Sequence, residues 1–485
     1  MDKFYEVLTW VGLFLYWLTV ASVTMRVVLR RRAMGVSLAW LLIIFILPIA
    51  GVILYLLFGE LNLGKKRAQR AKSMFKPYAD WMQDLSDCPG YLPHRMGFHA
   101  RPVHELCVNR TSIPSLTGND LSLNSNTANS LRSIASDIRH AKESVNMVFY
   151  IWHPGGHADD VAKAVCDASR RGVTVRIMLD SAGSKEFFRS HWPAAMRNAG
   201  VHLIESLAVT PFRMFFRRQD IRQHRKIVVI DNAIGYTGSM NMVDPRFFKQ
   251  DSGVGQWVDV MVRINGPVVP LLNSIICWDW EVETGHRNLP PHNCVIPEGH
   301  KHLHHAVQVV PSGPSMPDGL IQQVLHLAIH QAQRSVTITT PYLVPGDYLL
   351  ETLKTTAYRG VDVSIIIPAK NDSLMVEWAS RAFFSDLLEA GVKIYRFGGG
   401  LLHTKSVVVD DDYCLIGTVN MDMRSFWLNF ELTLAVDDPE FCSDLISLQK
   451  TYLGKSTMVD IDKWKRRPIY NKPIEQFFYM FSPLL

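Results

Sequence analysis

Two long uncharged stretches open the chain. Residues 7–25 and residues 33–59 contain no charged side chain, and each stretch is long enough to cross the roughly 30 Å of hydrocarbon in a bilayer. Uncharged runs of this length are rare in soluble folds, and the first run lacks the small-residue cleavage site of a signal peptide. The pattern therefore predicts a two-helix transmembrane hairpin over residues 1–62, with Pro48 kinking the second helix.

After residue 62, segments whose apolar residues have the spacing of a helix alternate with segments whose apolar residues have the spacing of a strand. The same order of segments occurs twice. The run RRGVTVRIMLD (170–180) resembles YRGVDVSIIIP (358–368), and NAGVHLIE (198–205) resembles EAGVKIYR (389–396). Each copy begins with helix-spaced apolar residues, followed by a strand-like run, VNMVFYIW in the first copy and VTITTPYLV in the second. Alternating helices and strands predict an α/β sandwich in each copy.

The duplication sets the expected domain boundaries. The chain has 485 residues and 48% hydrophobic content, which is enough material for several units. We expect a site between the two copies. The predicted units after the hairpin are a basic juxtamembrane linker (63–115), a first half (116–298), a second half (299–455) and a basic-aromatic carboxy-terminal tail (456–485).

Charge and cysteine content narrow the function classes. The net charge of +6 is modest for this length, so it favours contact with an anionic surface but does not require nucleic acid. Basic residues flank both ends of the second uncharged stretch, and the longer run follows it, at residues 65–76. By the positive-inside rule we expect both termini and the body in the cytoplasm. The seven cysteines are scattered and contain no CxxC pair, so they indicate neither a disulfide framework nor a cysteine zinc site.

Both copies carry one template of polar residues. The runs QHRKIVVIDNAIGYTGSMN (223–241) and LHTKSVVVDDDYCLIGTVN (402–420) align without a gap. Residues two apart in a strand share a face, so each histidine and lysine point together, and the aspartate five residues after each lysine falls on the other face. We assign the aspartates an organising role. The candidate catalytic residues are His224, Lys226, Asp231, His403, Lys405 and Asp410, and the candidate phosphate-binding residues are Ser239, Asn241, Thr418 and Asn420.

This doubled set of groups suits a phosphodiester. Two lysines and two asparagine amides can stabilise the charge of a five-coordinate transition state, which is work that a metal ion does elsewhere, so no metal or cofactor is required. One neutral histidine can attack phosphorus while the other donates a proton to the departing oxygen, giving a covalent phosphohistidine. A histidine in such a role needs an orienting partner. Asp259 and Glu431, at similar strand positions downstream, are the candidates.

The HxKx₄Dx₆G[ST]xN pair resembles the phospholipase D superfamily. The segments AWLLIIFILPIAGVILYLLFGE, FYIWHPGG, GVGQW and GTVNMDMRS, together with the amino-terminal spans, resemble the long-chain bacterial cardiolipin synthases. The resemblance implies a transferase of the bacterial inner membrane that condenses two phosphatidylglycerols into cardiolipin and releases glycerol. It also implies that His224 attacks first, with His403 as acid and then base.

Other functions and segments leave alternatives open. The same half-sites can serve a hydrolase, another phosphatidyl transferase, a nuclease or a non-enzymatic scaffold. A nuclease would gain nothing from two membrane spans, so the spans disfavour that function. The catalytic positions are intact in both halves, which disfavours a non-enzymatic scaffold. The basic-aromatic run at 211–226 can meet a membrane or form a solvated loop, and the tail can lie at the interface or pack on the body. The run HKHLHH (300–305) reads as a polar linker rather than a metal site.

Overall fold

A computed structural model describes residues 2–30, 34–60, 63–87, 91, 96–208, 218, 220–291 and 306–482. The chain divides into two units, one made of Met1–Lys66 and Val209–Ile221 and the other of Arg67–Ala208 and Arg222–Leu485. The second unit contains both copies of the repeat. Arg31, Arg32, the basic-aromatic residues 211–217 and the run HKHLHH lie outside the described residues.

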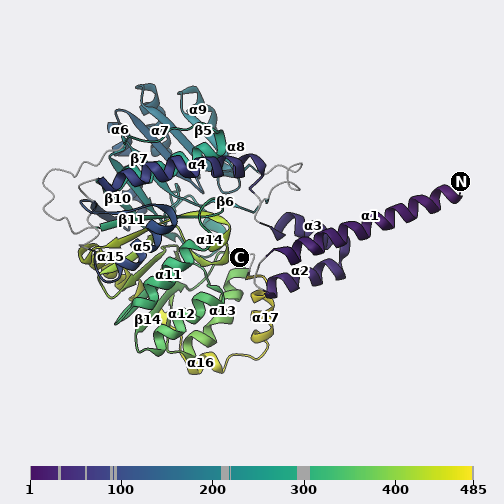
Figure 1. Ribbon diagram of the computed structural model, residues 1–485. Helices are drawn as coiled ribbons and strands as arrows, with labels where there is room; N and C mark the ends of the chain where they lie inside the picture. Colours follow the sequence, from purple (N-terminus) through teal and green to yellow (C-terminus); the bar gives the residue numbers. More distant parts are fainter. Residues whose placement is uncertain are drawn as a thin grey trace. The chain divides into compact units, whose positions relative to one another are not determined.

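The amino-terminal unit contains one long helix and two short ones (Figure 1). Among the described residues, one helix is long and apolar enough to cross a membrane, at Lys3–Leu29, and the apolar helices that follow are shorter. Pro48 has no N–H to continue a helix, and the helix is interrupted just before it, between α2 and α3. The expected two-helix transmembrane hairpin is therefore not confirmed. The elements are α1 (Asp2–Leu29), α2 (Met34–Ile46), α3 (Pro48–Leu54) and a π-helical turn, η1 (Tyr55–Gly59).

Helix α3 turns back against α2. A Cβ atom on Gly51 would lie only 2.6 Å from the carbonyl oxygen of Ile43, so this close approach requires glycine. Just beyond α3, the ring of Tyr55 packs edge to face on Trp40 of α2, with 5.3 Å between ring centroids. The two short helices therefore pack on each other.

Buried Glu60 joins the two ends of the α2–α3 segment. Its carboxylate accepts hydrogen bonds from the guanidinium of Arg26 at 2.6 and 2.7 Å, and Arg30 lies 3.0 Å away. The Tyr55 hydroxyl also donates to Glu60, at 2.9 Å. Since Arg26 and Arg30 precede α2 and Glu60 follows η1, the segment begins and ends at the same place.

The first half of the body is a seven-stranded mixed sheet. The strands β3, β4 and β5 are parallel to one another and are linked by helices, as the sequence pattern predicts, while β7, β8 and β10 form an antiparallel part. The strands in spatial order are β2 (Asp120–Asn124), β10 (Met261–Asn265), β8 (Ile234–Gly238), β7 (Ile227–Ile230), β3 (Ser144–Phe149), β4 (Thr174–Asp180) and β5 (His202–Ser206). Its helices are α6 (Thr127–His140), α7 (His157–Arg170), α8 (Lys185–Arg189), α9 (Trp192–Asn198) and α10 (Val269–Thr284).

The second half repeats this arrangement with extra strands at its edges. Its strands β12, β14 and β15 are again parallel. The spatial order is β1 (Ser115–Leu116), β11 (Ala306–Ser312), β20 (Asn429–Asp437), β18 (Tyr413–Gly417), β17 (Ser406–Val409), β12 (Ser335–Thr339), β14 (Asp362–Pro368), β15 (Lys393–Phe397) and β21 (Ser456–Met458). Its main helices are α11 (Leu320–Gln331), α12 (Gly346–Tyr358), α13 (Leu374–Glu389), α14 (Met423–Trp427) and α15 (Pro439–Leu453).

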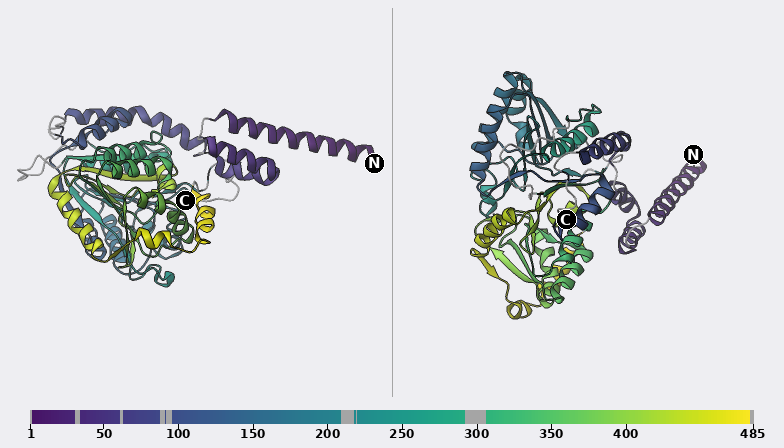
Figure 2. Two further views of the ribbon diagram at one scale, coloured as in Figure 1. Left: turned by 90° about the horizontal axis from the view of Figure 1, so that it is seen from below. Right: turned by 60° about the vertical axis from the view of Figure 1, so that its left-hand side comes forward.

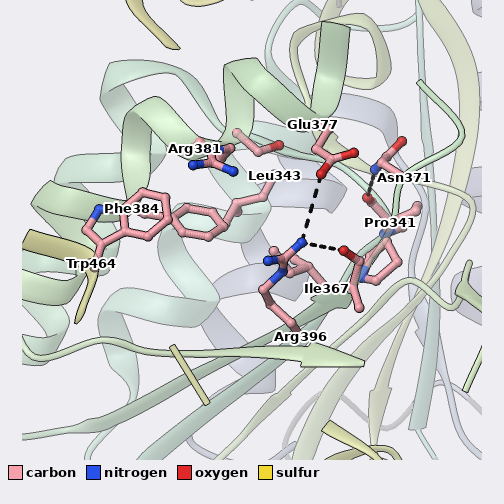
Figure 3. A pocket seen from close by; sticks show the side chains of 12 residues that line it. Pro341, Leu343, Ile367, Asn371, Glu377, Arg381, Phe384, Arg396 and Trp464 are labelled. Carbon is pink, nitrogen blue, oxygen red and sulfur yellow. Dashed lines mark hydrogen bonds and ion pairs between the residues drawn. The ribbon is translucent and has the colours of Figure 1, made fainter. Parts of the chain in front are cut away.

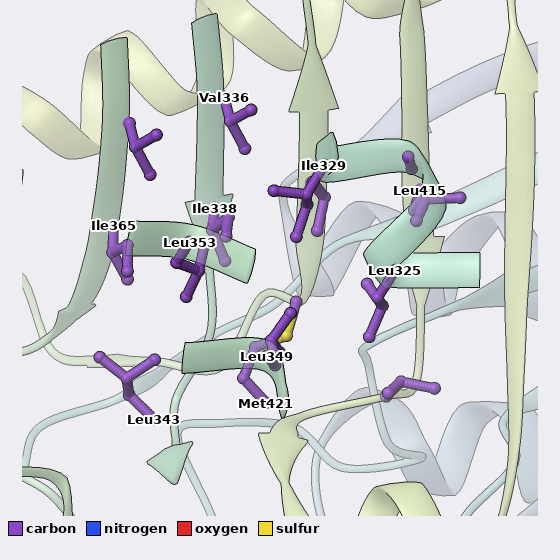
Figure 4. Close-up of a cluster of buried hydrophobic side chains, with 14 of the residues drawn as sticks. Leu325, Ile329, Val336, Ile338, Leu343, Leu349, Leu353, Ile365, Leu415 and Met421 are labelled. Atoms are coloured by element: carbon purple, nitrogen blue, oxygen red, sulfur yellow. The ribbon is translucent and has the colours of Figure 1, made fainter. Parts of the chain in front are cut away.

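The two halves share a hydrophobic core. One cluster of buried side chains contains Ile227 and Val262 of the first sheet together with Val408 and Leu434 of the second. Figure 2, right, shows the two halves, teal above and green to yellow below. Each half also has a core of its own, and Figure 4 shows that of the second half, where Leu325 and Leu353 of the helices meet the strands. Because the sheets pack against each other, the loops of both halves are held in fixed relation.

The segments on either side of the halves pack on the body. Helix α4 (Lys65–Gln83) contacts α10 through the rings of Tyr78 and Trp278, 4.9 Å apart. Helix α5 (Ala100–Thr111) packs against α11. The tail forms α16 (Ile461–Lys465) and α17 (Asn471–Tyr479), and the ring of Tyr479 contacts Phe383 of α13. Of the two alternatives for the tail, the structure supports packing on the body.

Candidate active site

Each histidine motif follows a short strand that pairs with the other half. Strand β6 (Arg222–Gln223) precedes the first motif and runs parallel to the start of β20 in the second half. Strand β16 (Leu401–Leu402) precedes the second motif and runs parallel to β9 (Trp257–Val258) in the first half. The backbone N–H of His224 donates to Phe430 O, and that of His403 donates to Val258 O, both at 2.9 Å. The backbone at each histidine motif therefore pairs with a strand of the opposite half.

The orienting carboxylates are exchanged in the same way. His224 Nδ1 lies 2.8 Å from both carboxylate oxygens of Glu431, which belongs to the second half. His403 Nδ1 lies 2.7 Å from Oδ1 of Asp259, which belongs to the first half. All four side chains are buried. Each carboxylate holds a hydrogen on Nδ1, so the Nε2 atom of each imidazole is left with its lone pair.

Ser239 and Thr418 support these carboxylates. The Ser239 hydroxyl donates to Asp259 Oδ1 at 2.6 Å and accepts from the backbone N–H of Val260 at 3.0 Å. The Thr418 hydroxyl donates to Glu431 and accepts from the backbone N–H of Leu432 at 2.8 Å. The sequence-based prediction gave these hydroxyls to the phosphate. Here their hydrogens are held by the carboxylates, each of which orients the histidine of the other motif.

Lys226 and Lys405 are buried beside the histidines. Each ammonium donates to the backbone carbonyl of the histidine two residues before it, at 2.7 Å for Lys226. Burial lowers the pKa of Lys226 to about 8 and that of Lys405 to about 7, although nearby carboxylates oppose the change. Each ammonium thus keeps donors for a further acceptor in a place from which water is largely excluded.

The histidines are neutral in the free protein at pH 7. Burial lowers the pKa of both His224 and His403 to about 4, and the paired carboxylate only partly offsets this effect. A neutral imidazole with hydrogen on Nδ1 is a competent nucleophile through Nε2. A bound phosphodiester anion would raise the pKa of either imidazole, which is what a proton donor needs.

The two half-sites open into one cavity of ≈ 730 Å³, a volume that includes its mouth. His224, His403, Asn241 and Asn420 line it. Asn241 accepts from the backbone N–H of Ile151 at 3.2 Å, and its buried Nδ2 has no partner among the described residues. An amide N–H that faces an open cavity without an acceptor fits a phosphate oxygen.

Asp231 and Asp410 lie away from the cavity, at the turns that join β7 to β8 and β17 to β18. Both adopt positive φ, of 49°, which aspartate tolerates in such turns. Asp231 accepts from the backbone N–H groups of residues 142–144 at 2.8 to 2.9 Å. Asp410 accepts from those of residues 333–335, and its Oδ2 lies 3.0 Å from His99 Nε2. These contacts support the organising role that we expected for both aspartates from the alternation of side chains along a strand.

We expect Asp410→Ala to lower the free energy of unfolding by about 3 kcal/mol, because three N–H groups lose a buried charged acceptor. Asp231→Ala should cost about half as much, because water reaches part of its site. Denaturant unfolding of the detergent-solubilised protein measures both values. Turnover per folded molecule should stay within a few fold of that of the unmodified protein. Loss of turnover at unchanged stability would contradict an organising role.

Arg225 is a buried residue that the sequence reasoning missed. Its Nε donates to the backbone oxygen of Glu431 at 3.0 Å, and its guanidinium pairs with buried Asp279 of α10. Gln223 also donates to Asp279, at 2.8 Å. These contacts brace the chain on both sides of His224. An aspartate inside the apolar helix SIICWDW could have pointed to a buried cationic partner.

Aromatic rings flank the two imidazoles differently. The ring of Tyr150 meets His224 edge on, with 4.9 Å between centroids, whereas Trp257 lies tilted over His403 at 4.3 Å.

No three His, Cys, Asp or Glu side chains gather as metal ligands in the described part of the chain.

The pKa shifts predict a pH profile for kcat/KM with two limbs. Below about pH 4 both histidines become protonated and the nucleophile is lost, and above it the acid histidine holds its proton beside the bound phosphodiester anion, which raises its pKa. As pH rises through about 7 to 8, Lys405 and then Lys226 lose their protons, and the attraction to an anionic substrate falls. Initial rates measured in constant-ionic-strength buffers would show this decline. A profile that is flat to pH 10 would contradict the role of the lysines.

Comparison with known proteins places the chain among lipid-modifying enzymes. Residues 134–259 and 325–450 match the family described as "Cardiolipin synthase, PLD-like domain", and residues 14–60 match "Phospholipase_D-nuclease N-terminal". Cardiolipin synthase A of Yersinia pestis bv. Antiqua (strain Angola) and that of Yersinia pseudotuberculosis serotype O:3 (strain YPIII) are each 52% identical over 486 residues, covering 100% of both chains. The crystal structure of phosphatidylserine synthase from Haemophilus influenzae aligns with a TM-score of 0.55 at 15% identity, covering 79% of this chain and 98% of that one.

Proposed function

Because this chain belongs to the cardiolipin synthases of the phospholipase D superfamily, we propose that its exchanged half-sites transfer a phosphatidyl group between two phosphatidylglycerols through a covalent phosphohistidine. Membership makes the chain a phosphatidyltransferase, with phosphatidylglycerol as substrate and cardiolipin as product. The observation that carries the mechanism is the pair of buried histidines, each held by a carboxylate of the opposite half and both lining one cavity.

The first step forms the phosphohistidine. The Nε2 lone pair of one histidine forms a bond to phosphorus, the bond from phosphorus to the glycerol oxygen breaks, and the other histidine gives that oxygen its proton. His224 and His403 each pair through Nδ1 with a carboxylate of the opposite half, so the geometry supports a reaction that uses both histidines but does not distinguish their roles. The resemblance to the superfamily supplies the order, with His224 attacking and His403 donating the proton.

The second step reverses these roles. A hydroxyl of the acceptor phosphatidylglycerol gives its proton to the histidine that served as acid. Its oxygen bonds to phosphorus as the bond from phosphorus to nitrogen breaks. Glycerol has left in the first step, so each turnover yields one cardiolipin and one glycerol. Asn241 and Asn420, which line the cavity, and the buried Lys226 and Lys405 beside the histidines would stabilise the charge on the phosphoryl oxygens in both steps.

Product analysis tests the proposal. Purified protein in vesicles containing phosphatidylglycerol with a labelled headgroup should release one labelled glycerol for each cardiolipin formed. Phosphatidic acid as the sole lipid product would favour the alternative, a phospholipase D-type hydrolase. Incorporation of a different alcohol in preference to phosphatidylglycerol would identify another phosphatidyl transferase.

The apolar amino-terminal helix supports membrane anchoring, and we propose that α1 alone crosses the bacterial inner membrane. Arg26 and Arg30 contact Glu60, so α2 and α3 would enter the bilayer and leave it on one side. The basic residues before α2 and those at 65–76 then share the cytoplasmic face, which satisfies the positive-inside rule for both runs. The body is cytoplasmic in this arrangement, and the amino terminus lies outside.

Reporter fusions distinguish this topology from the two-span hairpin that the sequence predicts. A reporter at the amino terminus should be active only outside the inner membrane, and a reporter at the carboxy terminus only inside. The two-span, multi-pass hairpin places both reporters in the cytoplasm. A labelled cysteine at either end of α2–α3 gives the matched control, since both ends should be reached from the cytoplasm.

A further inference from the structure

The duplicated fold provides an internal comparison of the two walls of the cavity. Leu343 pairs with Met421 in the second half as Trp152 bridges to Met242 in the first. This register makes several cavity-lining positions equivalent, and their side chains differ in polarity. The first half places Ile151, buried Val243 and Trp257 where the second half places Tyr342, Asp422 and Asn429, and all of these except Val243 line the cavity.

Asp372 adds a carboxylate to the second-half wall. Its Oδ1 accepts from the Tyr342 hydroxyl at 2.8 Å, and its Oδ2 pairs with Lys249 at 3.1 Å across the cavity. In the first half, the Ser184 hydroxyl, which follows the matching strand β4, donates to the backbone oxygen of Tyr150 at 3.0 Å. None of the described first-half residues that line the cavity carries a carboxylate, and the shared chemistry at phosphorus does not require one.

Residues that neighbour Asp372 in the chain are held by hydrogen bonds, and Figure 3 shows those of Asn371 and Arg396. Asn371 donates to the backbone oxygen of Pro341 at 2.8 Å. Arg396 donates to the backbone oxygen of Ala369 and lies 3.9 Å from Glu377. These bonds tie the end of β14 to the segment that bears Tyr342. The two side chains are thus positioned before any substrate binds.

Asn429 contributes an acceptor without a donor. Its Nδ2 donates to Glu431 Oε1 at 3.2 Å, which fixes the direction of the amide. Its Oδ1 is buried, lines the same cavity and has no hydrogen-bond partner among the described residues. Buried polar atoms are almost always paired, so a ligand that donates a hydrogen bond is expected here.

The charges around this wall favour a neutral donor over a cation. Lys249 already pairs with Asp372, and Arg222 and Arg424 line the same cavity. Burial raises the pKa of Asp422, so its carboxyl group is less readily ionised. An ammonium headgroup would meet these cations, whereas a hydroxyl can donate to the carboxyl and amide oxygens without such repulsion.

We propose that Tyr342, Asp372, Asp422 and Asn429 form a subsite for the glycerol headgroup of phosphatidylglycerol. This inference rests on the proposed transferase function. The histidine that protonates the leaving oxygen also deprotonates the attacking one, so the two oxygens occupy the same place in turn. The subsite therefore holds the leaving glycerol first and the glycerol of the acceptor lipid afterwards, which favours transfer over attack by water.

The ratio of cardiolipin to phosphatidic acid tests this subsite, because it depends only on the molecules that turn over. With vesicles of labelled phosphatidylglycerol, Asp372→Asn should lower the ratio about tenfold, and Tyr342→Phe about threefold, as a hydrogen bond to the acceptor is weakened. Asp362→Asn is the matched control. Asp362 begins strand β14, at the end opposite the loop that carries Asp372, in an exposed pair with Lys393, and its change should leave the ratio unchanged.

The outcomes separate the subsite from the reaction. If the unmodified protein makes cardiolipin and neither variant changes the ratio, the subsite is wrong and the transferase stands. If the unmodified protein makes only phosphatidic acid, the transferase itself is wrong. Free glycerol and free ethanolamine supplied together give a further check. Glycerol should be the preferred acceptor, and equal incorporation of ethanolamine would overturn the assignment of an uncharged headgroup.

Discussion

Replacing either His224 or His403 with alanine is expected to lower cardiolipin formation by about 10³- to 10⁴-fold or more, because each removes a group that the reaction uses twice. Loss of the nucleophile prevents the phosphohistidine, and loss of the acid leaves glycerol without a proton. The double variant should be no worse than the more damaged single variant, since the two residues act as one unit. Initial rates with labelled phosphatidylglycerol measure all three.

His286→Ala is the matched control for these variants. His286 is exposed and lies beyond α10, so its loss should leave the rate unchanged. Each imidazole is buried, and its loss leaves Glu431 or Asp259 without its partner, so thermal unfolding of each variant is measured and rates are compared per folded molecule. Near-normal activity in either histidine variant would rule out the two-histidine mechanism.

Glu431→Gln and Asp259→Asn carry the second large expectation, a fall in kcat of about 10²- to 10⁴-fold with little change in KM. An amide in place of the carboxylate can present its N–H to Nδ1, which turns the imidazole to the tautomer with hydrogen on Nε2. It also removes the negative charge that supports a protonated imidazole. Neither carboxylate lines the cavity, so both are positioning residues.

Two readouts distinguish positioning from a merely structural role. The acid limb of the pH profile should move in both amide variants, because the pKa of the attached histidine changes. The conservative variants Glu431→Asp and Asp259→Glu should recover part of kcat, while the exposed-surface change Glu389→Gln should leave it unchanged. A fall in folded protein with an unaltered pH profile would contradict the positioning role.

The repeat accounts for how much of this site could be predicted from the sequence. Five polar positions and a glycine recur in register in two copies. The alternation of side chains along a strand separated His224 and Lys226 from Asp231, which the structure places at a hairpin turn. The α/β character of each half followed from the same periodicity. Such local patterns are written in one segment of chain, so a single sequence reveals them.

Pairing between the halves is the part that could not be predicted. His224 meets Glu431 rather than Asp259 because short strands of one half pair with strands of the other. Sequence spacing does not encode that register. Ser239 illustrates the consequence, since its hydroxyl supports a carboxylate that belongs to the opposite histidine. In the same way, the sequence around Pro48 shows that this stretch is apolar, but it does not reveal that α3 folds back on α2.

The exchange of partners makes each half dependent on the other. His403 is oriented by Asp259, and His224 by Glu431, so a half on its own would contain a histidine without its carboxylate. The shared core holds the two in register. Each histidine–carboxylate pair is therefore built from both copies of the repeat.

The stereochemical course at phosphorus tests the central claim most directly. The phosphohistidine mechanism requires two in-line displacements, one by histidine and one by the acceptor hydroxyl, and each inverts the configuration. Phosphatidylglycerol made chiral at phosphorus with sulfur or oxygen isotopes should therefore give cardiolipin with overall retention. Overall inversion would mean a single direct displacement, with no phosphohistidine on the path.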